Sequence, residues 1–249
     1  MHSHNPGAPG DTNAATFETT RWSVVLAAGG RASPQSEQAL ARLCACYWSP
    51  LYAYVRRRGF SADAAQDLTQ AFFARLLEKK TLSAATRERG KFRCFLLASM
   101  KHFLANEWDR SQAQKRGGKA TLVSFDAAAL EQRYAGEASY ELSPERLFDR
   151  RWAVTLLQLV LDELRRELIA EGKERFFDRV KQHLTGEESE LSYRELGIEL
   201  GMSEAALKVA IHRLRRRYGK LLHEHIAQTV ASAAEVEDEL RHLLASVSS

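Results

Sequence analysis

The sequence lacks an apolar run long enough to span a lipid bilayer. Its first fifteen residues, MHSHNPGAPGDTNAA, also lack the apolar core of a secretory signal. Because this start is rich in Gly, Pro, Asn and Ala and has little to bury, residues 1–16 are predicted to be disordered. We therefore expect a cytoplasmic protein without membrane contact.

Cysteine is scarce as well, and three residues in a chain of 249 exclude a disulfide framework. Cys44 and Cys46 lie two apart on a predicted helix and so point in different directions, which argues against a shared metal ion. We expect these two and Cys94 to be buried thiols. The sequence predicts neither a metal ion nor a cofactor.

The alternating apolar pattern of β-strands is absent too, so we expect an all-α fold. Helical periodicity dominates as far as residue 110, whereas the next stretch, which contains SQAQKRGGKA, has no sustained apolar period. Ser143 and Pro144 then supply a helix cap and a first helical residue. The prediction is two small helical domains at residues 17–110 and 143–222, a flexible linker at 111–142 and a C-terminal helical extension at 223–249.

A helix-turn-helix pattern lies in the second predicted domain, between residues 192 and 222. Ser192 and Glu195 form a capping box that begins a short helix, and Gly201 supplies the turn that ends it. Ser203 caps a second helix. This geometry is typical of a recognition helix that enters the major groove of DNA.

The second helix of this pattern is strongly basic on one side. Its apolar residues Leu207, Ile211 and Leu214 recur with helical spacing and should face the core. Residues 203–220 contain six Lys or Arg against the single acid Glu204, although the whole chain has a net charge of only +4. This local concentration of positive charge favours a polyanionic partner. The alternative is a solvated basic helix in an ordinary bundle.

The first predicted domain contains the helical segment DLTQAFFARLLE, residues 67–78. Leu68, Phe72 and Leu76 form one apolar stripe, and Phe73 and Leu77 form a second stripe beside it. The opposite face consists of Asp67, Gln70, Ala71, Ala74 and Glu78. Spacing alone favours a solvated surface for that face.

Aromatic and basic residues alternate along the next segment, residues 91–118. Phe92 and Phe95 lie beside Lys91 and Arg93, in a pattern that can stack on unpaired bases and hold phosphates. Two interpretations of these rings stay open, base stacking or packing in the core. Phe103 and Leu104 are expected in the core.

In this order the segments resemble a sigma-70-family sigma factor of the extracytoplasmic-function type. The resemblance covers residues 37–222 and rests on four motifs in series: Tyr52-Ala-Tyr-Val-Arg-Arg-Arg58, Asp67-x-x-Gln70, Phe92-Arg-x-Phe-Leu96 and Tyr193-Arg-Glu-Leu196. It implies a bacterial, non-enzymatic protein that binds core RNA polymerase, directs it to promoter DNA and assists strand opening. It also allows an anti-sigma factor as a further partner.

The resemblance assigns roles to three groups of residues. The polymerase-binding face would consist of Asp67, Gln70, Ala71, Ala74 and Glu78. The −10 element would be bound and melted by Lys91, Phe92, Arg93, Phe95, Asn106 and Arg110. The −35 element would meet Ser203, Glu204, Lys208, His212, Arg213, Arg215 and Arg216.

Two positions depart from the family pattern. Ala71 stands where the family usually has an acid after the glutamine, and Ala210 stands where its recognition helix usually has an arginine. A weaker or redistributed polymerase contact and reduced −35 readout would follow.

The C-terminal extension exceeds the minimal family pattern. Leu240 and Leu244 suggest an amphipathic helix, and four acids lie in the run from residue 235 to 239. This tail could dock on the second domain and compete with DNA for the arginine cluster. The other interpretation is an extra helix that extends the hydrophobic core.

Two other classes of function are possible. A helix-turn-helix regulator that does not engage polymerase would account for residues 143–222 but leaves the segment 91–118 without a purpose. A helical metalloenzyme would need a ligand set from His223, Glu224 and His225, or from His102 and Glu107. Neither set has the required ligand spacing on one helix face with a supporting carboxylate.

Overall fold

The computed structural model describes residues 46–77, 91–113, 131–132, 142–185, 191–230 and 232–248, together with positions 34 and 38. Within these ranges the secondary structure is helical throughout, without a strand, which confirms the all-α prediction for this part of the chain. None of the described helices is long and apolar enough to cross a membrane.

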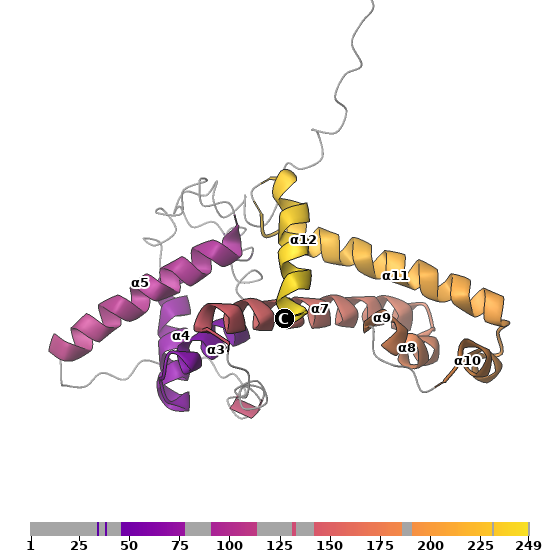
Figure 1. Ribbon diagram of the computed structural model, residues 1–249, viewed down its shortest axis with the longest axis horizontal. Helices are drawn as coiled ribbons and strands as arrows, with labels where there is room; N and C mark the ends of the chain where they lie inside the picture. Colours follow the sequence, from indigo (N-terminus) through magenta and orange to yellow (C-terminus); the bar gives the residue numbers. More distant parts are fainter. Residues whose placement is uncertain are drawn as a thin grey trace, which may run out of the picture.

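Nine helices have defined bounds in the described ranges, and Figure 1 shows their arrangement. The first three are α3 (Trp48–Arg57), α4 (Ala62–Leu77) and α5 (Phe92–Ala113). The later six are α7 (Pro144–Ala170), α8 (Glu174–Val180), α9 (Gln182–Thr185), α10 (Tyr193–Leu200), α11 (Glu204–Ala227) and α12 (Ala234–Val247).

The long helix α7 is the axis of the molecule. It begins as predicted, because the Ser143 hydroxyl accepts a hydrogen bond from the backbone N–H of Arg146 and Pro144 occupies the first turn. In Figure 1 α3, α4 and α5 lie at one end of α7, while α8, α9 and α10 lie at the other. Helices α11 and α12 also pack directly on α7.

One continuous hydrophobic core joins these helices. Helix α3 packs more extensively on α7 than on α4, its neighbour in sequence. Trp152 of α7 is buried in the same core as Leu51 of α3 and Leu243 of α12. The two halves of the chain are therefore in direct contact through α3 and α7.

Several details differ from the sequence predictions. Helix α5 continues past residue 110 to Ala113, and α11 continues past residue 222 to Ala227, so neither predicted boundary coincides with a helix end. In α12 Leu243 is buried and Leu244 is exposed, which shifts the expected apolar stripe by one residue. The side chain of Cys94 is exposed and that of Cys46 half-buried, so the expectation of buried thiols is wrong for Cys94; Cys44 lies outside the described residues.

Candidate functional site

The turn between α10 and α11 has the geometry that its sequence predicts. The Ser192 hydroxyl accepts from the backbone N–H of Glu195 at 3.3 Å, and the Glu195 carboxylate accepts from the backbone N–H of Ser192 at 2.9 Å. Gly201 ends α10 with a left-handed φ of 66°, and Ser203 caps α11. The capping box, the glycine turn and the second cap are confirmed.

A second glycine, Gly197, allows the backbone after the turn to approach α10 closely. This residue was not identified from the sequence. A Cβ atom on Gly197 would lie 2.7 Å from the backbone oxygen of Met202, closer than real Cβ contacts come. The backbone N–H of Met202 donates to the Gly197 oxygen at 2.8 Å. The chain after the turn therefore passes directly over α10, at a place where only hydrogen fits.

The outer face of α11 is open to solvent. The core-facing residues Leu207, Ile211 and Leu214 are buried as predicted. All seven residues expected at the −35 element are exposed, namely Ser203, Glu204, Lys208, His212, Arg213, Arg215 and Arg216.

The cations of α11 are not equivalent, because some are already engaged. Arg215 donates to the backbone oxygen of His183 through Nε at 3.0 Å and through its terminal nitrogen at 2.8 Å. Lys208 pairs with Glu204 at 2.6 Å and lowers the pKa of that carboxyl by its hydrogen bond. Arg213 and Arg216 make no such contact within the described residues. Within the described chain, these two arginines can therefore take a phosphate without giving up a protein partner.

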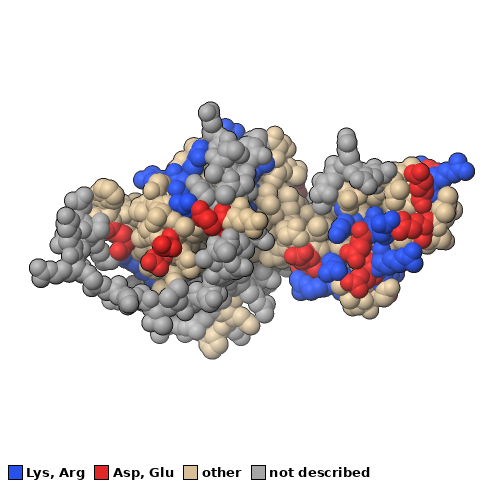
Figure 2. Space-filling model, turned by 90° about the horizontal axis from the view of Figure 1, so that it is seen from below, with Lys and Arg blue, Asp and Glu red and all other residues tan. Residues whose placement is uncertain are grey.

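The neighbouring face of the same end of the molecule is different. Figure 2 shows Lys and Arg side chains next to Asp and Glu over the end that α8 and α10 form. Arg165 pairs with Glu174 at 2.8 Å, and Arg179 pairs with Glu199. Cations and acids balance there, so this face attracts a polyanion less than α11 does.

Helix α4 has the amphipathic distribution that its sequence predicts. Phe72, Phe73 and Leu76 are buried. Of the expected polymerase-binding residues, Asp67, Ala71 and Ala74 are exposed and Gln70 is half-buried. Glu78 lies outside the described residues. The face is thus accessible, and its role stays a prediction.

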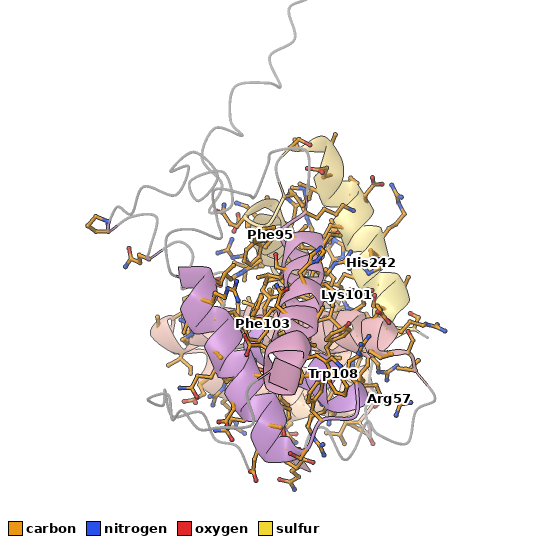
Figure 3. The ribbon with its side chains drawn as sticks, turned by 90° about the vertical axis from the view of Figure 1, so that its left-hand side faces the viewer. Arg57, Phe95, Lys101, Phe103, Trp108 and His242 are labelled. Atoms are coloured by element: carbon orange, nitrogen blue, oxygen red, sulfur yellow. The ribbon has the colours of Figure 1, made fainter. Side chains whose placement is uncertain are left out.

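The start of α5 does not offer its aromatic rings to solvent. Phe92 and Phe95 are buried, and the Phe92 ring packs edge-on against Tyr47 at 5.2 Å between centroids. Of the two interpretations of Phe92 and Phe95, the structure supports packing in the core. Phe103 and Leu104 are buried as expected, and Figure 3 shows Phe95 and Phe103 on the α4 side of α5, with Lys101 and Trp108 on the other side.

Arg93 is the largest departure from the predicted site, because it is buried in an ion cluster. Its Nε donates to Oε1 of Glu239 at 2.9 Å, and a terminal nitrogen donates to Oδ1 of Asp149 at 2.5 Å. Lys91 Nζ lies 3.1 Å from Oε2 of Glu239. Burial alone would raise the pKa of Glu239, but the hydrogen bonds and charges of Arg93 and Lys91 outweigh it and lower that pKa.

The outer half of α5 retains an exposed polar surface. Asn106 is exposed, and Trp108 is 60% exposed, the largest aromatic side chain at the surface of the described chain. Lys101 pairs with Glu145 of α7 at 2.8 Å. Arg110 lies within the helix, but the structure does not describe its side chain. Among the expected −10 residues whose side chains are described, Asn106 is the one that is exposed.

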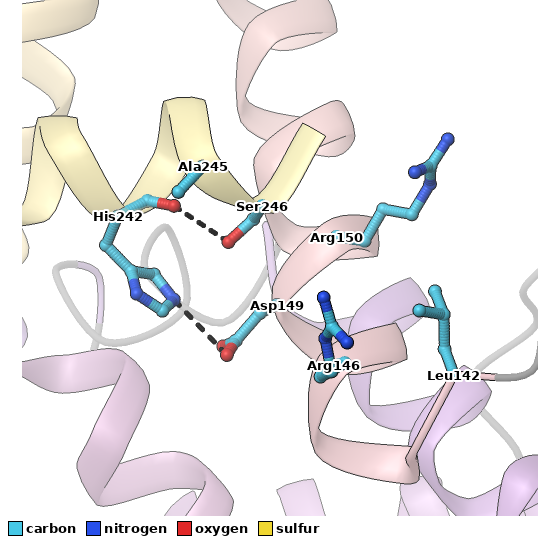
Figure 4. A pocket seen from close by; sticks show the side chains of 7 residues that line it. All are labelled: Leu142, Arg146, Asp149, Arg150, His242, Ala245 and Ser246. Atoms are coloured by element: carbon cyan, nitrogen blue, oxygen red, sulfur yellow. Dashed lines mark hydrogen bonds and ion pairs between the residues drawn. The ribbon is translucent and has the colours of Figure 1, made fainter. Parts of the chain in front are cut away.

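A small pocket of about 160 Å³ lies where α7 meets the end of α12. Arg146, Asp149 and Arg150 line it from α7, and His242 and Ser246 line it from α12 (Figure 4). Nε2 of His242 is 3.2 Å from Oδ2 of Asp149. Asp149 thus links both α12 and Arg93 to α7.

In the part of the chain that the structure describes, the histidines of the metalloenzyme alternative on α11 lie next to single carboxylates. His225 contacts Glu163 at 2.6 Å, and His223 lies 3.9 Å from Glu237. No group of three His, Cys, Asp or Glu side chains within the described ranges is placed to hold a metal ion.

Comparisons of the chain with protein-family models, with curated proteins and with solved structures found no match. The function is therefore inferred from the residues and from their geometry.

Proposed function

We propose that this chain is a sigma factor of the extracytoplasmic-function type, which binds core RNA polymerase and directs it to promoters. The observation that carries the proposal is the α10–α11 unit. Its two helices are capped and joined by a tight glycine turn, and α11 presents Arg213 and Arg216 to solvent without protein partners in the described chain. Such a helix can be inserted into the major groove and held by phosphates.

A second exposed surface supports polymerase binding. The polar face of α4, with Asp67 and Gln70, lies at the opposite end of α7 from the α10–α11 unit (Figure 1). Two separate surfaces suit a protein that bridges polymerase and DNA. In this proposal residues 17–110 and 143–222 are two functional units that pack together through α3 and α7, and the α10–α11 unit is a helix-turn-helix.

The competing proposal is a DNA-binding regulator that does not engage polymerase. It uses the α10–α11 unit equally well and gives no role to the α4 face. Promoter-specific transcription with purified bacterial core polymerase separates the two, because only a sigma factor makes core polymerase initiate at a promoter.

The decisive experiment combines this assay with a double substitution, Asp67→Ala and Gln70→Ala. Its expected result is a loss of core binding of about tenfold, or ~1.4 kcal/mol, with helicity and thermal unfolding little changed because Asp67 is exposed and Gln70 only half-buried. Asp178→Ala on α8 removes a carboxylate of similar exposure far from α4 and serves as the control. If the wild type, the double variant and the Asp178→Ala control bind core RNA polymerase with equal affinity, the proposal is contradicted.

A further inference from the structure

Helix α12 packs on α7 and α11 and places Glu239 beside the cations at the first turn of α5. The α12 residues that are buried are Val236, Glu239 and Leu243. Glu239 is 1% exposed and is the only buried carboxylate in the described chain. Its two oxygens are taken up by Lys91 and Arg93, the cations at the start of α5.

The connection between α11 and α12 reinforces this contact. The backbone N–H of Phe92, the first residue of α5, donates to the backbone oxygen of Thr229 at 2.9 Å. Thr229 lies just after α11 and before α12. A backbone donor and two side-chain cations at one helix start are therefore all occupied by the C-terminal part of the chain.

We propose that α12 is an intramolecular cover that holds Glu239 in the place of a DNA phosphate on Lys91 and Arg93, and that DNA binding by α5 requires α12 to undock. The inference rests on the proposed function and adds regulation to it. The site of the expected competition also differs: α12 packs on α7 and α11 and pairs with Lys91 and Arg93, while Arg213 and Arg216 of α11 stay exposed.

The geometry allows the exchange because Arg93 keeps two partners when Glu239 leaves. Asp149 on α7 accepts from one terminal nitrogen, and the guanidinium carbon lies 5.1 Å from the centroid of the Trp152 ring. Arg93 thus stays oriented, with Nε and the second terminal nitrogen open to an oxyanion. A phosphate presents the same pair of acceptor oxygens as the carboxylate that it replaces.

The buried face of the docked helix is partly polar. Its fully buried side chains are two aliphatic residues and one carboxylate, Leu240 and Val247 pack partly buried against the core, and Glu237 and Asp238 are exposed. A buried ion pair contributes little net stability compared with apolar packing, and it suits a contact that must be released. The Phe92 ring packs on Tyr47, which is not part of α12, so this contact does not depend on the docked helix.

The test uses the full-length chain, with E239Q and E239K as variants and E237Q and E237K as matched controls. Both positions are glutamates on α12 and undergo the same change of charge, but Glu237 is exposed and lies near His223 of α11. Binding of a labelled forked DNA duplex with a single-stranded tail is measured at low salt. We expect affinity to rise about tenfold in E239Q and further in E239K, relative to the control of equal charge, as the undocked state becomes more populated.

A second measurement decides the outcome if a variant loses its fold. Amide hydrogen exchange of the wild-type chain is followed with and without the forked DNA, and residues 234–247 should exchange faster in the complex. The proposal is overturned if the Glu239 variants keep their helicity and bind DNA no more tightly than the Glu237 controls. It is also overturned if DNA binding leaves the exchange protection of α12 unchanged. Failure to bind core polymerase in every variant would instead overturn the proposed function.

Discussion

At the scale of single residues, burial decides what Phe95 does. The ring is 2% exposed and stacks near Phe92 at 6.3 Å between centroids. We predict that Phe95→Ala lowers the free energy of unfolding by about 3–5 kcal/mol, because it leaves a cavity in the core. Chemical denaturation measures the loss. Trp108→Ala, at an exposed aromatic of the same helix, should cost much less, and equal costs would contradict the core assignment.

The ion cluster around Glu239 predicts a dependence of stability on pH. The pKa of Glu239 is lower in the folded protein than that of an ordinary glutamate. The ion pairs of Glu239 therefore contribute stability above the ordinary glutamate pKa. This stability is lost as the pH falls through the pKa of the folded state. Lys91 and Arg93 face this carboxylate from the start of α5, Asp149 pairs with Arg93, and His242 lies 3.2 Å from Asp149.

Wild type should therefore be more stable than E239Q at neutral pH, by on the order of 1–3 kcal/mol, and the difference should shrink in acid. Thermal unfolding of both proteins across the acid range measures it. A difference that stays constant over this range would show that the charge of Glu239 is not what holds α12.

At the scale of elements, the α10–α11 turn depends on one close backbone approach. A Cβ on Gly197 would meet the Met202 oxygen at 2.7 Å, whereas one on Gly219, inside α11, would meet nothing within 4 Å. We predict that Gly197→Ala destabilises the protein by about 1–3 kcal/mol through steric overlap. Gly219→Ala should stabilise it by up to about 1 kcal/mol, because alanine favours helix over glycine.

Thermal unfolding of the two glycine variants gives the comparison, since each adds one methyl group to a helix of the same unit. If the tight turn also positions α11 for DNA, Gly197→Ala should weaken DNA binding and Gly219→Ala should leave it unchanged. We expect Gly197→Ala to lower the stability and Gly219→Ala to raise it. A gain of stability in both variants would contradict the close contact between Gly197 and the Met202 oxygen.

At the scale of the whole molecule, charge is distributed unevenly over the surface. Paired charges cover the α8 and α10 end, while Arg213 and Arg216 remain available on α11. We predict that changing both arginines to Ala makes the negative slope of log affinity against log salt shallower by about 2, because each phosphate that is no longer neutralised removes roughly 0.9 from its magnitude.

Arg215→Ala is the control for this salt dependence. Arg215 donates to the backbone oxygen of His183 on α9. Its removal should therefore lower the thermal stability and have little effect on the salt slope. DNA titrations at several salt concentrations measure the slope, and thermal unfolding measures the stability. If Arg215→Ala changes the slope as much as Arg213→Ala does, then the assignment of available cations on α11 is wrong.

The sequence predicted features whose cause lies within a few residues. Helical periodicity indicated the all-α class and the buried stripes of α4 and α11, because side chains three or four apart share a face wherever the helix packs. Caps at Ser143, Ser192 and Ser203 and the turn at Gly201 were also predictable, since each depends on hydrogen bonds or dihedral angles of its immediate neighbours.

The tertiary structure decided which of these residues remain available. Spacing could not distinguish Arg213 from Arg215, because the partner of Arg215 lies 32 residues away on α9. Nor could it place Arg93, whose carboxylate partner Glu239 is 146 residues distant in sequence. Local physics fixes which face a side chain occupies; whether that face meets solvent, core or an opposite charge is set by packing between distant segments.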